Sequence, residues 1–139
     1  MAKENKTEEV AVKSKELFYR GKNLDELKIL DVRESAKYLP SRSRRYILRN
    51  FDVIEKFIKR CERKIAKRKK IRTHKREIVI VPKLVGFTIS VYNGKNFEEV
   101  PITVEMIGHR LGEFSMPTGK VTHSAAGIGA TKSSKSLKK

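Results

Sequence analysis

The sequence predicts a small α+β domain, in which a short mixed or antiparallel sheet packs against helices, with flexible basic extensions at both ends. Two changes in pattern indicate this fold. Apolar residues recur at helical spacing through residues 42–67, whereas apolar and polar residues alternate through residues 87–92. We therefore expect a flexible leader at 1–16, one domain at 17–116 and a basic, glycine-containing tail at 117–139.

Helices are expected in the first half of the domain. Asn23 can cap a short helix, with Glu26 three residues later as the capping-box partner. A second helical stretch around residues 35–39 ends at Pro40. A long basic helix over residues 42–67 repeats apolar side chains at alternating spacings of four and three, so that one stripe packs onto the domain. This stripe consists of Ile47, Phe51, Ile54, Ile58, Cys61 and Ile65.

Strands are expected in the second half of the domain. The β-branched residues 78–82 (IVIVP) predict a short strand, and two further strands flank Asn93–Gly94, a strong hairpin signal. The prolines at 82 and 101 favour strand ends or an edge strand. Thr103 can cap a short helix at 103–110, and residues 111–116 (LGEFSM) indicate another extended piece.

Charge is the strongest functional signal. The 139 residues carry a formal net charge of +17, and residues 42–76 alone hold 16 basic and three acidic side chains. Such segregation is typical of a surface that binds a polyanion, with nucleic acid the leading candidate. The lone Cys61 excludes an intrachain disulfide, and no apolar run approaches the roughly 20 residues that span a bilayer. We expect a soluble, cytoplasmic protein.

The sequence gives little support for catalysis or metal binding. The three histidines lie in unrelated contexts without zinc spacing. Residues 118–120 (TGK) lack the earlier glycine of a phosphate-binding loop, and Gly127 and Gly129 lack the third glycine of a dinucleotide fingerprint. No spacing among the glutamates at 98, 99, 105 and 113 specifies a metal pair. We therefore expect no enzyme, no cofactor, no metal and no small-molecule substrate.

Several long motifs occur in one collinear order. NGKNF is followed by VPITVEMIGHRLGEF, preceded by FYRGKNLDEL, LPSRSRR and IRTHKREIVIVPKLVGFTISVYNGK, and followed by HSAAGIGATKSS. Together they resemble the family of small-subunit ribosomal protein nineteen, in its archaeal or eukaryotic form, over about residues 17–135. The chain departs from the family pattern at Val104, Arg110, Ser124 and Ala126. These departures leave the family assignment intact and bear on the path of the tail.

The resemblance implies a ribosomal protein that binds the 3′ major domain of small-subunit rRNA in the subunit head. It also implies contact with small-subunit protein thirteen and a tail that extends towards the decoding region and the aminoacyl-site tRNA. The charge pattern alone leaves open a free nucleic-acid chaperone, a DNA-binding architectural protein or, less favoured, a metal-dependent nuclease.

The expected rRNA contacts combine three groups of residues. Arginine and lysine side chains can bind phosphates, glycines at turns allow close approach of the backbone, and histidines lie beside both. The full set is Arg42, Arg44, Arg45, Lys69, Lys70, Arg72, His74, Lys75, Arg76, Asn93, Gly94, Lys95, His109, Arg110, Gly112, Lys120, His123, Gly127, Gly129, Lys132, Ser133 and Lys135.

Overall fold

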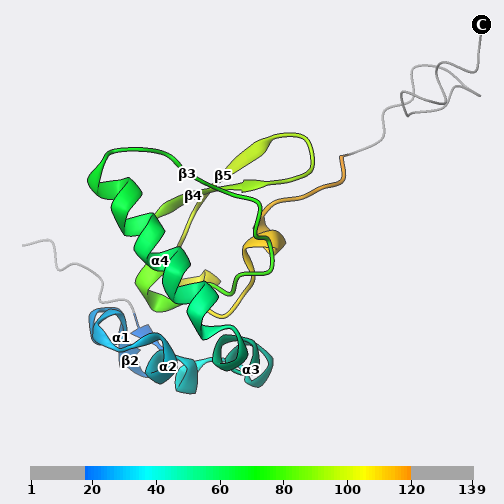
Figure 1. Ribbon diagram of the computed structural model, residues 1–139. Helices are drawn as coiled ribbons and strands as arrows, with labels where there is room; N and C mark the ends of the chain where they lie inside the picture. Colours follow the sequence, from blue (N-terminus) through cyan, green and yellow to red (C-terminus); the bar gives the residue numbers. More distant parts are fainter. Residues whose placement is uncertain (1–17, 120–139) are drawn as a thin grey trace, which may run out of the picture.

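A mixed three-stranded sheet and the helices beside it form the fold, as predicted (Figure 1). The structure is a computed structural model that describes residues 18–119. The predicted leader at 1–16 and all tail residues from 120 onward lie outside the described residues, so the division into leader, domain and tail stays a prediction. In the sheet β4 lies between the other two strands, parallel to β3 and antiparallel to β5. The strands are β3 (Ile71–Thr73), β4 (Thr88–Tyr92) and β5 (Phe97–Pro101).

The predicted hairpin is confirmed, with Tyr92 paired to Phe97 at its closed end. The four residues between them turn the chain. The side-chain oxygen of Asn93 accepts hydrogen bonds from the backbone N–H groups of Lys95 (3.0 Å) and Asn96 (2.8 Å). Gly94 has a φ of 101°, a conformation that other residues rarely adopt. Asparagine followed by glycine therefore closes the hairpin for the reasons that the sequence suggested.

Strand β3 was missed by the sequence analysis because it lies inside the basic run. Ile71 and Thr73 are buried and Arg72 is exposed, so three residues are too few to show the alternation. The strand forms because it pairs with β4, the buried centre of the sheet. The lysine- and arginine-rich composition of the segment does not reveal this pairing, because the pairing depends on tertiary contacts.

Five short elements precede the two larger helices. Two two-residue strands pair and lead into α1, whose cap is confirmed because the Asn23 side chain accepts a hydrogen bond from the backbone N–H of Asp25 at 3.3 Å. The second predicted helical stretch is present as α2 and a 3-10 turn. The elements are β1 (Phe18–Tyr19), β2 (Lys22–Asn23), α1 (Leu24–Ile29), α2 (Val32–Ser35) and η1 (Ala36–Tyr38).

The single long helix predicted over 42–67 is wrong, because the structure has two helices, α3 (Ser41–Arg49) and α4 (Phe51–Ala66). Asn50 separates them with φ −116° and ψ 30°. Its backbone N–H and its side-chain amide both donate to the carbonyl of Tyr46, at 3.0 and 3.1 Å. The Asn50 side chain competes for a backbone carbonyl and ends α3 here. Helix α4 then runs in a different direction (Figure 1).

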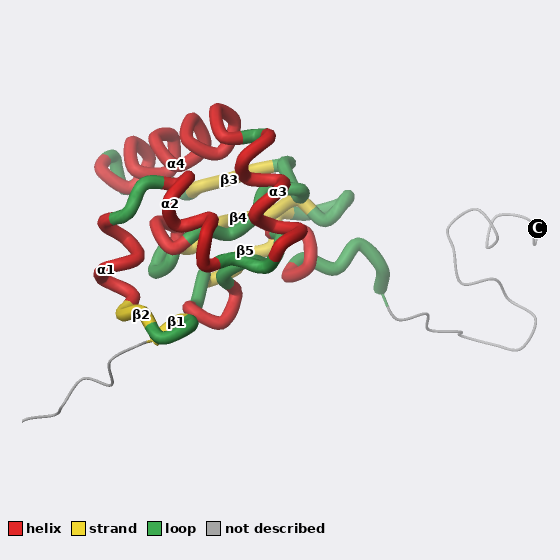
Figure 2. The backbone as a smooth tube through the Cα atoms, turned by 90° about the horizontal axis from the view of Figure 1, so that it is seen from below, coloured by secondary structure: helices red, strands yellow, loops and turns green. Residues whose placement is uncertain are grey.

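Most of the apolar stripe is nevertheless buried. Ile47, Ile54, Ile58 and Cys61 lie in the core, and Phe51 is half-buried against it. Ile65, in the last turn of α4, is 43% exposed, so its assignment to the packed stripe is wrong. Phe57, which the sequence analysis did not include, is buried instead, because the buried face of α4 follows residues 54, 57, 58 and 61. Figure 2 shows α4 lying alongside the sheet next to β3.

Residues 78–81 lie at the centre of the core, but they form no strand beyond a single bridge between Val79 and Arg110. They run extended against the loop at 107–112. The N–H of Ile80 donates to the carbonyl of His109 at 2.8 Å, and the N–H of Gly108 donates to the carbonyl of Ile80 at 3.0 Å. The predicted strand is therefore a buried segment that pairs with an irregular loop.

Two further local expectations need correction. The helix expected at 103–110 is only a 3-10 turn, η3 (Val104–Met106), and the Thr103 side chain makes no capping hydrogen bond. Residues Leu111–Phe114 form another 3-10 turn, η4, instead of an extended piece. The first turn directly precedes the loop at 107–112, which packs on residues 78–81, and the second begins within that loop, so tertiary contacts decide their conformation. No helix among the described residues is long and apolar enough to cross a lipid bilayer.

Candidate nucleic-acid interface

Helix α3 exposes arginines on a face that the loop at 107–112 completes. A hollow of about 170 Å³ lies between them, lined by Arg42, Arg45, Tyr46, Arg49, Asn50 and Arg110. The guanidinium of Arg110 lies 5.4 Å from the centre of the Tyr46 ring. Within residues 18–119, none of these four arginines forms an ion pair with a carboxylate. We call this group the arginine hollow.

The loop is held on α3 by close contacts that aim Arg110. Gly108 has a φ of 89°, and a Cβ at this position would lie 3.0 Å from Cδ of Pro40. The Ser43 hydroxyl donates to the carbonyl of Gly108 at 2.6 Å. Glu113 accepts a hydrogen bond from the backbone N–H of Arg110 at 3.1 Å. Glycine is therefore required for this contact, which brings a distant arginine to α3.

Two titratable groups at this site have shifted pKa values. Burial raises the pKa of Tyr46, and the charge of Glu77 raises it further, so the phenol remains a neutral donor. Burial also raises the pKa of Glu113, but the hydrogen bonds from Arg110 and His109 outweigh this effect and lower it overall. His109 is exposed, and its Nδ1 lies 2.6 Å from the carboxylate of Glu113.

The outer side of α4 carries a second basic surface that the predicted site set largely missed. An open groove of about 490 Å³ lies between side chains spaced three, four or seven apart from residue 56 to residue 67, together with Lys69 beyond the end of the helix. Its lining is Lys56, Arg60, Arg63, Lys64, Lys67 and Lys69. Helical periodicity places the residues of α4 in this set together on the face opposite the apolar stripe, so the same pattern could have predicted them.

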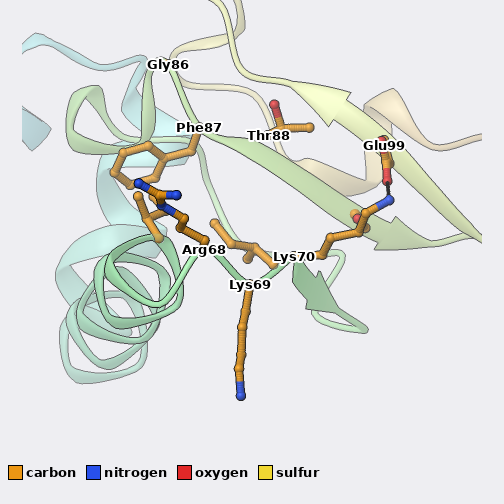
Figure 3. Close-up of a pocket in the computed structure, with 10 residues that line it drawn as sticks. Arg68, Lys69, Lys70, Gly86, Phe87, Thr88 and Glu99 are labelled. Atoms are coloured by element: carbon orange, nitrogen blue, oxygen red, sulfur yellow. Dashed lines mark hydrogen bonds and ion pairs between the residues drawn. The ribbon is translucent and has the colours of Figure 1, made fainter.

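The end of α4 adopts an unusual conformation. The N–H of Lys69 donates to the carbonyl of Lys64 at 2.9 Å and the N–H of Arg68 to that of Ile65 at 2.8 Å, the two bonds of a Schellman motif. Arg68 has a φ of 50°, where glycine is usual. In Figure 3, Arg68 extends towards Phe87, whereas Lys69 points away from the other labelled side chains.

These residues border a hollow with a volume of about 580 Å³. Apolar side chains from α4 and the sheet line one part of it, and polar groups line the rest. On the polar side Lys70 contacts Glu99 at 2.7 Å, as the dashed line in Figure 3 shows. The hydrogen bond and charge of Lys70 hold the pKa of Glu99 below its usual range.

Arg76 lies half-buried and binds the protein itself. Its guanidinium donates to the backbone carbonyls of Tyr92 (2.6 Å), Gly112 (2.8 Å) and Ser115 (2.5 Å). A Cβ at Gly112 would lie 3.0 Å from Cβ of Arg76, so this glycine permits the contact. Both residues belong to the predicted rRNA-binding set, and the structure gives each of them a packing role within the fold.

Arg44 is exposed on α3 but does not line the arginine hollow, and the remaining predicted residues lie around the hairpin or beyond the described chain. Arg72, Lys75, Gly94 and Lys95 are exposed, and Asn93 closes the turn. The structure thus separates the predicted set into the arginine hollow, the end of α4 and the hairpin region. Its members in the tail lie outside the described residues: Lys120, His123, Gly127, Gly129, Lys132, Ser133 and Lys135.

The described side chains form no arrangement suited to metal binding or to nucleophilic catalysis. Among residues 18–119, no group of three or more His, Cys, Asp or Glu side chains could hold a metal ion. Cys61 is buried, and burial raises the pKa of its thiol to about 11. The thiol therefore remains protonated and unreactive at neutral pH.

The fold and the arginine hollow define a class: a small basic α+β protein with a surface suited to polyanions. The sequence profile described as Ribosomal protein S19 matches residues 43–123. Small ribosomal subunit protein uS19 of Halorubrum lacusprofundi is 48% identical over 126 residues, which cover 87% of this chain and 89% of that protein. Its namesake from Saccharolobus solfataricus is 44% identical over 130 residues, covering 91% and 93%. The chain belongs to the ribosomal protein S19 family, which consists of structural proteins and not of enzymes.

Proposed function

We propose that this chain is a structural constituent of the small ribosomal subunit, which binds rRNA in the subunit head. The names of its relatives support the subunit, and the arginine hollow supports the RNA. Four arginines that line one hollow, with no carboxylate partner among residues 18–119, repel one another. A phosphate in the hollow relieves this repulsion and accepts paired hydrogen bonds from the planar guanidinium groups. The hollow is the single observation on which this proposal rests.

We expect the protein to recognise the shape and the phosphate backbone of folded RNA. Arginines of α3 bind phosphates in the hollow, and the groove along α4 offers a second basic surface to the RNA. Because both elements present charge and few base-reading amides, the contacts fix the position of the protein on the RNA more than they select a base sequence. The exposed His109 lies beside the hollow, where it can contact the same strand.

A matched pair of double variants tests the role of the hollow. Arg45→Gln with Arg49→Gln removes two charges that line it, whereas Lys28→Gln with Lys83→Gln removes two charges from α1 and η2. Each lost phosphate contact should reduce the slope of log affinity against log salt by about 0.7–0.9. We expect the first variant to lose affinity for an rRNA head fragment and to show a shallower slope, with the second close to wild type. Equal losses in both variants would show that only net charge matters.

The position in the subunit is tested separately. We propose contact with small-subunit protein thirteen, and a path of the tail towards the aminoacyl-site tRNA, as the family resemblance implies. The full chain should sediment stoichiometrically with salt-washed small subunits, and crosslinking should join it to protein thirteen. Substoichiometric recovery, or recovery with DNA, would instead identify a nucleic-acid chaperone or architectural protein.

Truncation at residue 119 should preserve cooperative unfolding but weaken function on the assembled subunit.

A further inference from the structure

Three aromatic rings meet at the closed end of the hairpin, outside the arginine hollow. The ring centres of His74 and Tyr92 lie 4.6 Å apart, those of His74 and Phe97 5.1 Å, and those of Tyr92 and Phe97 5.2 Å. We call these three residues the aromatic trio. The sequence analysis named His74 as an RNA contact but missed Tyr92 and Phe97, since the pairing of β4 with β5 brings the rings together.

The trio lies on the solvent side of the sheet. His74 is exposed, and Tyr92 and Phe97 are only half-buried. The register pairs Tyr92 with Phe97, and two residues away Ser90 pairs with both Arg72 and Glu99, so all five share one face. The apolar residues Ile89 and Val91 occupy the opposite face and are fully buried. The aromatic side chains therefore do not belong to the core.

Cationic groups adjoin these rings. The guanidinium of Arg72 lies 5.5 Å from the centre of the Phe97 ring, within the range of a cation–π contact. Lys95 extends the positive charge to the hairpin turn and is exposed. The Tyr92 hydroxyl donates to the carbonyl of Gly94 at 2.7 Å, which fixes the orientation of its ring. A rigid aromatic surface beside free positive charge suits a planar ring attached to a phosphate.

We propose that the aromatic trio stacks an unpaired base of RNA, while Arg72 contacts the adjoining phosphate. The inference deepens the proposed function and rests on it, because the partner is the same RNA. Aromatic side chains on an open sheet bind unpaired bases in this way in other RNA-binding folds. A peptide fits less well, because the charged side chains of Arg72 and Glu99 share this face with the rings.

Phe97→Leu removes the ring of the trio that Arg72 adjoins but keeps an apolar side chain on β5. The full-length protein is titrated with single-stranded oligoadenylate and with a fully paired RNA duplex, at several salt concentrations. Stacking of one base contributes about 1–3 kcal/mol, or about 5- to 150-fold in affinity. We expect the variant to lose at least about fivefold on oligoadenylate, with an unchanged salt slope and unchanged affinity for the duplex.

Two control variants separate stacking from folding. Phe18→Leu changes another aromatic residue, 60% exposed on β1, and should bind both RNAs like wild type. Phe97→Tyr keeps the ring and should restore binding, which a general weakening of the hairpin would not explain. Urea unfolding of all variants reports whether each one is folded.

The outcomes distinguish the two proposals. If wild type binds both RNAs with strong salt dependence but Phe97→Leu changes neither, or weakens both alike, the stacking inference is overturned and the proposed function stands. If wild type binds neither RNA, both fail together. Selective loss on the single strand, rescued by tyrosine, supports stacking.

Discussion

The arginines of α3 and the basic run at 67–76 both carry positive charge with no acidic residue among them, but the structure uses them differently. On α3, Arg45 and Arg49 line a hollow with no carboxylate partner among the described residues. In the run, Arg76 donates to three backbone carbonyls and Lys70 pairs with Glu99. A count of positive charges therefore overstates the number available to a phosphate, because part of the charge holds the protein together.

The difference has a physical origin. An exposed helix face leaves its side chains free, whereas a strand and the loops around it surround their side chains with backbone carbonyls that need donors. Arginine serves the second purpose well because its planar group carries five donors. Variants that separate the stabilising role from the binding role would sharpen this comparison.

The largest effect is expected for Arg76→Lys, which keeps the charge but cannot donate to three separated carbonyls. Charged hydrogen bonds each contribute about 1.5–3 kcal/mol, so we expect the free energy of unfolding to fall by about 3 kcal/mol. Lys75→Ala, at the exposed neighbouring position, should change it by less than about 0.5 kcal/mol. Urea denaturation measures both, and a stable Arg76→Lys variant would contradict the structural role.

An intermediate effect of opposite sign is expected for Arg68→Gly. Glycine tolerates the positive φ at the end of α4, so the free energy of unfolding should rise by about 1 kcal/mol. The same change should weaken RNA binding if Arg68 contacts a phosphate. Lys67→Gly is the control, because Lys67 has an ordinary φ of −91° and glycine there brings only its entropic cost. A loss of stability in Arg68→Gly would show that the conformation is not strained.

The smallest effect on stability is expected for Glu99→Gln, since the exposed pair with Lys70 adds little. The change frees Lys70 and should raise affinity for RNA, with a steeper salt slope. Glu98→Gln raises the net charge equally on the same strand but leaves that pair intact, so it should have a weaker effect. Filter binding across a salt series compares the two. Identical results would indicate that net charge alone is being measured.

The hairpin shows what local sequence can predict. Asparagine and glycine closed the turn as expected, because their conformational preferences act within four residues. The helix over 42–67 shows the limit, since a continuous apolar stripe did not reveal the break at Asn50. Similarly, residues 78–81 had strand composition but found an irregular loop as their partner. A local side-chain hydrogen bond accompanies the end of α3, whereas distant contacts outweighed the strand preference of residues 78–81.

By itself, the sequence determined the α+β class, the hairpin, most of the buried stripe and the family, because periodicity, turn chemistry and collinear motifs are properties of neighbouring residues. Only the tertiary structure decided which cations remain free and which aromatic rings meet. Arg110 reaches Tyr46 through a loop packed on α3, and Tyr92 reaches His74 through the paired strands. Contacts between residues far apart in the chain depend on how the elements pack, and composition does not encode that packing locally.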